Sequence, residues 1–100
     1  MTSETDRPAP ITVLDFRAAW CGTCRMVEPV LNRIVAGQAD VELHVVDVEC
    51  DATMAERYGV RSLPTLVFVA ASGREMVRLS GTMNGKQISQ AIADARSALA

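Results

Sequence analysis

The distribution of apolar residues along the chain predicts four strands and three helices. Two short runs are almost continuously apolar, which is typical of strands covered by helices on both faces. Two longer segments place apolar residues three and four positions apart, as amphipathic helices do. The predicted elements are a strand over residues 11–16, a helix from 21 to 37, a strand over 41–48, a short helix over 54–58, strands over 65–71 and 75–80, and a helix over 84–99.

The connections between these elements predict how the strands pair. A helix separates the first two strands, and a crossover of that length makes two strands parallel. Only a turn at Ser72-Gly73 separates the last two strands, which therefore form an antiparallel hairpin. Gly37 is a typical helix end, and either Asp51 or Thr53 can cap the short helix. The order β-α-β-α-β-β-α predicts an α/β fold with a four-stranded mixed sheet.

Residues 1–10 are expected to be a flexible tail, and residues 11–100 a single domain. The tail is polar, contains Pro8 and Pro10, and lacks the cationic start and apolar segment of an export signal. Ten basic and twelve acidic side chains give a net charge of −2, without the basic excess that binds nucleic acid. No apolar run is long enough to cross a bilayer. We therefore expect a cytoplasmic protein that binds neither nucleic acid nor membranes.

Cys21 and Cys24 stand where the first strand gives way to a helix, and this placement favours thiol chemistry. The unpaired amides and the dipole of a helix N-terminus stabilise an anion, so we expect Cys21 to be an exposed, acidic nucleophile. Cys24 follows one turn later, within reach to resolve a mixed disulfide at Cys21. A redox-silent pair and half of a metal site are the alternatives. Because zinc needs four ligands and only Cys50 and His44 remain, we expect no metal.

Several separated motifs of this chain resemble those of the thioredoxin family. The resemblance runs from about Ile11 to the C-terminus and implies a thioredoxin-like three-layer sandwich without the usual N-terminal strand and helix. It implies a thiol–disulfide oxidoreductase that reduces protein disulfides, with a redox-active Cys21–Cys24 disulfide and no other cofactor. It also implies a flavin- and NADPH-dependent thioredoxin reductase as partner. The motifs are Asp15-Phe16, Trp20-Cys21-Gly22-Thr23-Cys24-Arg25-Met26, Pro29, Tyr58-Gly59-Val60-Arg61, Leu63-Pro64-Thr65 and Gly81.

The same resemblance implies roles for residues around the cysteine pair. Asp15 matches a buried carboxylate that takes the proton of Cys24, and burial should raise its pKa; the alternative is a strand-end carboxylate bonded to backbone. Pro64 matches a cis-proline that faces the cysteines, and the backbone of Leu63 would then hold an extended substrate. The predicted substrate-binding residues are Trp20, Gly22, Thr23, Leu63, Pro64 and Gly81, with Val60 and Met83 as further apolar contacts.

Three residues near the site depart from the usual family pattern. Thr23 replaces the proline common between the two cysteines, and we expect a less reducing pair as a result. Arg17 stands where an uncharged side chain is usual, and its cation either lies near the thiolate or points to solvent. Val45 stands where a lysine often accompanies the buried aspartate, so we expect Asp15 to titrate differently here.

The strand over residues 41–48 is expected to lie at an edge of the sheet, since only ten residues precede the first strand. A valine-rich edge can pair with another chain, which makes self-association a hypothesis; a strictly monomeric mass at high micromolar concentration would contradict it. Cys50, outside the motif, is expected to have no role or to be a regulatory or intermolecular thiol.

Two alternatives to a disulfide reductase stay open from the sequence. One is a less reducing disulfide exchanger or oxidase, which Thr23 favours. The other is a redox-silent module that binds partners through the surface around Trp20, Pro64 and Gly81.

Overall fold

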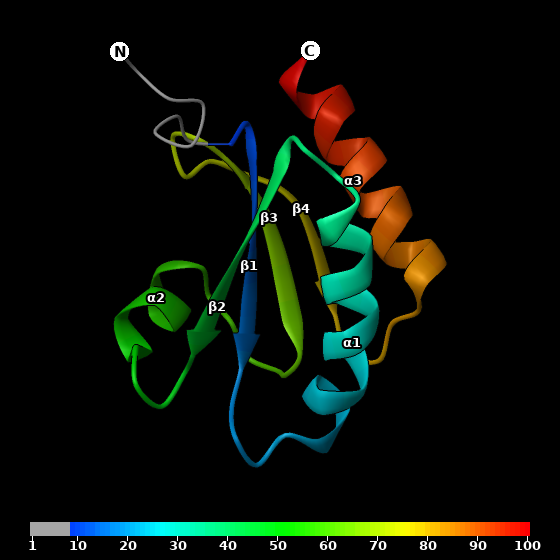
Figure 1. The fold of residues 1–100 in the computed structure, drawn as a ribbon. Helices are drawn as coiled ribbons and strands as arrows, with labels where there is room; N and C mark the ends of the chain where they lie inside the picture. The colour runs from blue at the N-terminus through cyan, green and yellow to red at the C-terminus, as the bar shows by residue number, and fades with distance from the viewer. Residues whose placement is uncertain (1–8) are drawn as a thin grey trace, which may run out of the picture.

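The computed structural model describes residues 9–100, and all the predicted elements are present in the predicted order (Figure 1). Residues 1–8, which make up most of the predicted tail, lie outside the described residues. Of the two candidate caps for the short helix, Asp51 is the one used, because its side chain accepts a hydrogen bond from the Met54 amide. The elements are β1 (Ile11–Arg17), α1 (Gly22–Ala36), β2 (Val41–Asp47), α2 (Ala52–Arg57), β3 (Thr65–Ala70), β4 (Glu75–Ser80) and α3 (Gly85–Leu99).

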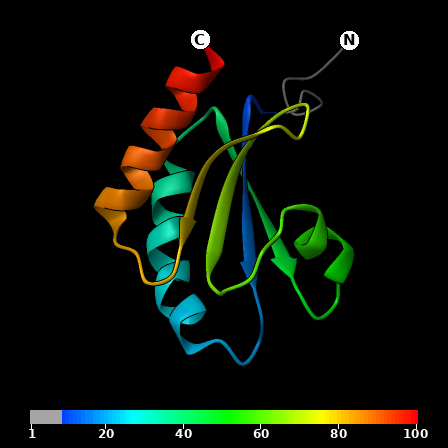
Figure 2. The same cartoon turned by 180° about the vertical axis from the view of Figure 1, so that it is seen from behind.

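The strands form one mixed sheet in the order β2-β1-β3-β4. β1 pairs in parallel with β2 and antiparallel with β3, while β3 and β4 form the antiparallel hairpin. Helices α1 and α3 cover one face of this sheet and α2 covers part of the other, as Figures 1 and 2 show from opposite sides. This arrangement confirms the predicted three-layer α/β fold. It also confirms that, within residues 9–100, β2 is an edge strand.

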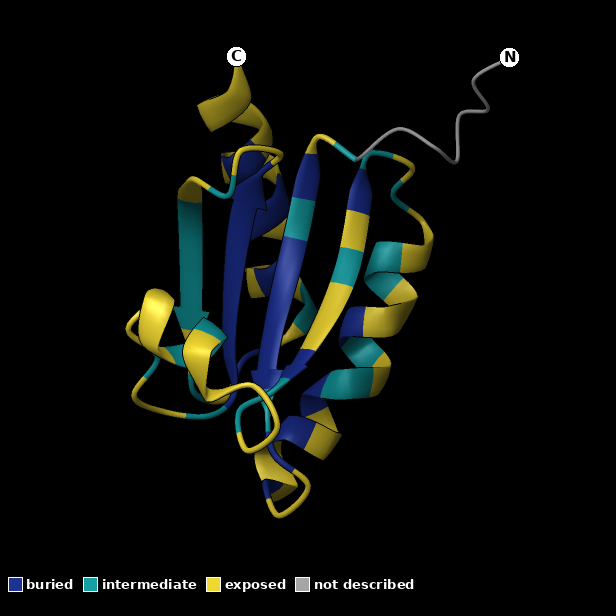
Figure 3. Cartoon of the chain, turned by 90° about the vertical axis from the view of Figure 1, so that its left-hand side faces the viewer, coloured by how far each residue is buried: buried dark blue, intermediate teal, exposed yellow. Residues whose placement is uncertain are grey.

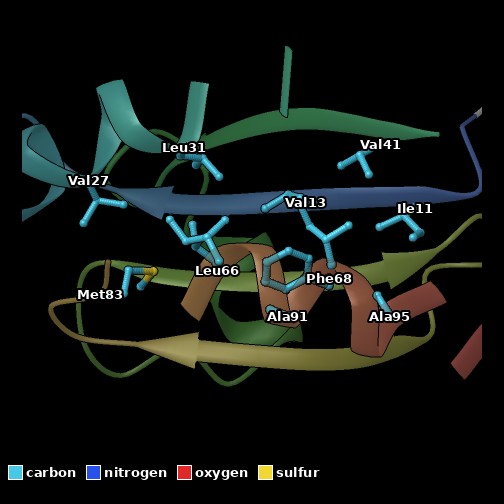
Figure 4. Packing of buried hydrophobic residues seen from close by; sticks show 12 residues of the cluster. Ile11, Val13, Val27, Leu31, Val41, Leu66, Phe68, Met83, Ala91 and Ala95 are labelled. Atoms are coloured by element: carbon cyan, nitrogen blue, oxygen red, sulfur yellow. The ribbon is translucent and has the colours of Figure 1, made fainter. Parts of the chain in front are cut away.

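A continuous apolar core joins the sheet to α1 and α3 (Figure 4). Phe68 of β3, Leu31 of α1 and Ile88 of α3 are all fully buried in it. Loss of such a side chain typically costs about 2–5 kcal/mol, so this core fixes α1 firmly against the sheet. The N-terminus of α1, where the cysteine pair lies, therefore has a defined position relative to the strands.

A second, smaller core lies between the sheet and α2. Phe16 of β1 and Val67 of β3 are its fully buried members, and Tyr58 packs against them from the end of α2. The central strands β1 and β3 are almost uniformly buried in Figure 3, whereas most of β2 is exposed or only partly buried. The two central strands are thus the rigid elements that position the functional site.

Candidate active site

The register of the sheet brings the predicted site segments together at one end of it. Phe16, near the end of β1, pairs with Thr65 at the start of β3, and Thr65 pairs with Ser80 at the end of β4. The segment leading from β1 to Cys21, the Leu63-Pro64 segment that enters β3, and Gly81 after β4 therefore meet at this end. Three parts of the chain that are distant in sequence thus contribute to one region.

Cys21 and Cys24 form a disulfide across the first turn of α1, with 5.3 Å between their Cα atoms. Cys21 is the N-cap of the helix, and its Sγ accepts a hydrogen bond of 3.1 Å from the Cys24 amide. The Thr23 hydroxyl lies 3.7 Å from the same sulfur. A helix amide directed at Sγ stabilises negative charge there, so the local geometry favours a Cys21 thiolate once the disulfide is reduced.

The prediction that Cys21 is exposed is wrong, although its position at the helix N-terminus is confirmed. Only 4% of Cys21 and 3% of Cys24 is accessible, while Gly22 and Thr23 between them are exposed. The physical reason is the capping geometry. Sγ turns back over the first helical turn toward the Cys24 amide, where the disulfide to Cys24 holds it.

Asp15 is a buried carboxylate in the centre of the sheet. It is 4% exposed and lies between Val45 of β2 and Leu66 of β3 in the register. Burial disfavours its charged form and raises its pKa; the Arg17 guanidinium opposes this shift, and the Glu28 carboxylate adds a smaller increase. Of the two readings of Asp15, the buried carboxylate with a raised pKa is the one that the structure matches.

Arg17 does not simply point to solvent, since its side chain is 22% exposed and ion-paired, and it borders the same cavity as Cys24. Its Nη1 lies 2.6 Å from Glu28 Oε2 of α1, and its Nε lies 3.8 Å from Asp15 Oδ2. The guanidinium therefore bridges a partly exposed carboxylate and a buried one. Sequence reasoning missed Glu28 by assigning it to the solvent side of α1; its position four residues after Cys24 is the signal that places both on one helix face.

A cavity of about 270 Å³ opens beside Cys24, between the first half of α1 and the ends of β1 and β2. Cys24 itself is buried, and this cavity is open space that its side chain borders. Both charged partners of Asp15 border it. Its lining consists of Arg17, Ala18, Ala19, Cys24, Arg25, Glu28, Val45 and Asp47.

The peptide bond between Leu63 and Pro64 is cis, as predicted. The Pro64 side chain is fully buried, and its carbonyl accepts a hydrogen bond of 2.9 Å from the Gly81 amide. Gly81 has φ +82°, a conformation that favours glycine, and a Cβ at this position would meet no atom within 4 Å. Leu63, Pro64 and Gly81 are thus linked into one short rim at the site end of the sheet.

A second hollow of about 300 Å³ runs from Trp20 along the segment that precedes Pro64. Trp20 is 67% exposed, which makes it the large apolar side chain at the mouth of this groove. The structure here brings together Trp20, Val60 and Leu63, three of the predicted contact residues, and adds residues that the sequence did not single out. The groove is lined by Trp20, Val48, Ala55, Val60, Arg61, Ser62 and Leu63.

The prediction that Met83 contacts substrate near the sulfurs is wrong. Met83 is 9% exposed and belongs to the apolar core beneath α1 and α3. The residue lies in the connection to α3, and its flexible apolar chain fills that core rather than facing solvent. Gly22 and Thr23 are exposed beside the disulfide but do not line the groove at Trp20.

Residues 9–100 contain no group of three or more His, Cys, Asp or Glu side chains arranged to hold a metal ion. Cys50 is free and exposed, and His44 is exposed on β2. Over the same residues, none of the helices has the length and apolar composition needed to cross a membrane.

Comparison with known proteins gives consistent matches. A family model described as thioredoxin matches residues 3–94. Thioredoxin-2 of Saccharomyces cerevisiae is 36% identical over 83 residues, covering 83% of this chain and 78% of that protein. Thioredoxin 1 of a Nostoc species is 38% identical over 89 residues, covering 87% and 80%. The crystal structure of oxidised mitochondrial thioredoxin 3 from Saccharomyces cerevisiae superposes with a TM-score of 0.78 at 29% identity, covering 86% and 79%.

The burial of Asp15 predicts how the stability of the oxidised protein depends on pH. Well below about pH 4, the range in which an unfolded Asp ionises, both the folded and the unfolded chain hold the Asp15 proton and the buried group carries no charge. As the pH rises, Asp15 ionises first in the unfolded chain, because its pKa is raised in the folded state. The wild type therefore loses stability until the pH passes the raised folded pKa, whereas Asp15→Asn has no such group and does not. The gain in unfolding free energy from Asp15→Asn should therefore grow between pH 4 and pH 8 in urea titrations. Equal gains at both pH values would contradict this prediction, and Glu49→Gln, an exposed change, is the matched control.

Proposed function

This chain belongs to the thioredoxin family and is a thiol–disulfide oxidoreductase, and we propose that Cys21 attacks the substrate disulfide while Cys24 resolves the mixed disulfide. The observation that carries this assignment is the hydrogen bond from the Cys24 amide to Cys21 Sγ at the N-terminus of α1. That amide stabilises negative charge on Cys21 and on no other sulfur.

The reaction consists of two exchanges in which electrons and atoms balance. The Cys21 thiolate attacks one sulfur of a protein disulfide, forming a mixed disulfide and releasing the other substrate sulfur as a thiolate. Cys24 then loses its proton and attacks Cys21 Sγ, which releases the second substrate sulfur. The substrate gains two electrons, and the chain is left with the Cys21–Cys24 disulfide, the state found in this structure.

Asp15 is proposed as the base that takes the proton of Cys24. A carboxylate accepts a proton efficiently when its pKa lies closer to the working pH, and burial shifts that of Asp15 in this direction. The surroundings of Cys24 support the proposal, because Arg17, the ion-pair partner of Asp15, lines the same cavity as Cys24.

The proposed substrate surface consists of Trp20, Gly22, Thr23, Leu63, Pro64 and Gly81. Its support is the meeting of these segments at one end of the sheet and the apolar groove beside Trp20. The backbone groups of Leu63 are suited to an extended substrate strand, since hydrogen bonds to main chain recognise no particular side chain. We therefore expect broad specificity for exposed protein disulfides.

The oxidised protein needs an electron donor, for which we propose a flavin- and NADPH-dependent thioredoxin reductase. The redox-active disulfide carries the electrons, and we propose no further cofactor or metal. A cytoplasmic location fits this electron transport role in redox homeostasis. Self-association through β2 stays a prediction, and the exposed Glu42, His44 and Val45 along that edge motivate it. The measurement is the mass of the protein at high micromolar concentration, and a strictly monomeric mass would contradict the prediction.

Replacing Cys24 with serine should trap substrates. Cys24→Ser leaves the attacking sulfur in place but removes the sulfur that resolves the mixed disulfide, so target proteins should remain linked to Cys21 and insulin reduction should fall by at least about 10³-fold. The measurement is non-reducing electrophoresis of the variant after incubation with oxidised insulin.

Cys21→Ser is the matched control for this experiment, and it should trap nothing. Trapping through Cys24 in that control would reverse the assigned roles. A third variant, Cys21→Ser with Cys24→Ser, has neither thiol. If it still complemented loss of the wild-type protein in cells, the chain would instead be a redox-silent binding module.

The residue between the cysteines should set the reduction potential. Thr23 lacks the fixed φ of proline, so the first turn of α1 is less constrained in the dithiol state, and we expect a less reducing pair. Thr23→Pro should lower the reduction potential, measured by equilibration with glutathione buffers. A potential that is equal or higher in Thr23→Pro would show that the reasoning is wrong, and Thr23→Ser, which keeps the hydroxyl near Cys21, should resemble the wild type.

A further inference from the structure

Arg17 occupies a position between two carboxylates of unequal exposure. It ends β1 two residues after Asp15, so both side chains project from the same face of the strand. The side chain of Asp15 is 6% exposed, that of Arg17 22% and that of Glu28 38%. The close contact, 2.6 Å, is to the partly exposed Glu28, and the longer one, 3.8 Å, is to the buried Asp15. Glu28 therefore anchors the guanidinium of Arg17, and the positive charge of Arg17 still lies close enough to interact with Asp15.

The same three groups are connected to Cys24. Glu28 follows Cys24 by one helical turn, and both border the cavity that Arg17 closes from the side of the sheet. The other charged groups facing this cavity are Arg25 of α1 and Asp47 of β2. From the neighbouring strands, Asp15 is faced by Val45 and Leu66, neither of which carries a charge. Among residues 9–100, Arg17 is the cation that forms an ion pair with Asp15.

We propose that Arg17, anchored by Glu28, is a positioning residue for the resolving step, which tunes how readily Asp15 accepts the proton of Cys24. This inference rests on the proposed role of Asp15 as base. In that step the proton of the Cys24 thiol passes to the Asp15 carboxylate, and Cys24 Sγ forms its bond to Cys21 Sγ. The bond from Cys21 to the substrate sulfur breaks, and the departing thiolate takes a proton from solvent.

The two partners of Asp15 act in opposite directions. The positive charge of Arg17 favours the ionised carboxylate, whereas the negative charge of Glu28 disfavours it directly and also offsets part of the charge of Arg17. Removing the charge of Arg17 should therefore leave Asp15 protonated up to a higher pH, where it cannot act as a base. Removing the charge of Glu28 while keeping its hydrogen-bonding shape should have the opposite effect.

The test is the pH dependence of the resolving step in full-length protein. Reduced enzyme is mixed with a small aromatic disulfide, and release of the second chromophoric thiol is followed by stopped flow between pH 5 and pH 9. Arg17→Gln should move the acidic limb of the profile to higher pH. At pH values on or below that limb, resolution should be slower than in the wild type by roughly tenfold. This loss of rate is smaller than the loss expected when a general base is removed. Glu28→Gln should move the limb to lower pH, and Arg17→Lys should restore most of the wild-type profile.

Two further variants make the outcome decisive. Arg33→Gln changes the same charge on the exposed end of α1, away from the cavity, and should leave the profile unchanged. Unshifted profiles in both Arg17→Gln and Glu28→Gln, with a slowed Asp15→Asn, would overturn the role of Arg17 and leave the base in place. An Asp15→Asn variant that resolves as fast as the wild type would overturn the base itself, and with it this inference.

Discussion

The Cys24 amide donates a hydrogen bond of 3.1 Å to Cys21 Sγ at the point where α1 begins. This contact joins the fold to the chemistry, because an amide aimed at a sulfur stabilises the thiolate that attacks a disulfide. Its geometry depends on the position of the whole helix. The core that packs Val27 and Leu31 against β1 and β3 holds α1 in place. The packing that stabilises the fold therefore also sets the contact that favours an acidic thiol at Cys21.

Charge around the second cysteine is arranged differently from charge around the first. Cys21 depends on backbone dipoles, whereas Cys24 lies beside a cavity bordered by ionisable side chains from three elements. Buried Asp15, bridging Arg17 and partly exposed Glu28 form a chain of charges from the sheet interior toward solvent. In the mechanism that we propose, this division makes Cys21 reactive near neutral pH and leaves Cys24 to give up its proton when the mixed disulfide is resolved.

Much of this arrangement was predictable from sequence because it follows from local patterns. Continuous apolar runs identified the strands, and the position of Cys21-Gly22-Thr23-Cys24 after the first strand located the helix N-terminus. What failed depends on tertiary geometry. The burial of Cys21 follows from the way its sulfur folds over the capped turn, and Met83 is drawn into the core by its neighbours on α1 and α3. The ion pair between Arg17 and Glu28 joins a strand end to a helix, and the apolar pattern of either element alone does not predict a contact between them.

The acidity of Cys21 in the reduced protein tests the account most directly. Its pKa can be measured from the pH dependence of alkylation by iodoacetamide in a Cys50→Ser background, which removes the exposed third thiol. The account predicts a pKa well below the value of about 8.5 that an ordinary thiol has. A pKa at or above that value would contradict it, because the helix N-terminus would then give the attacking sulfur no advantage.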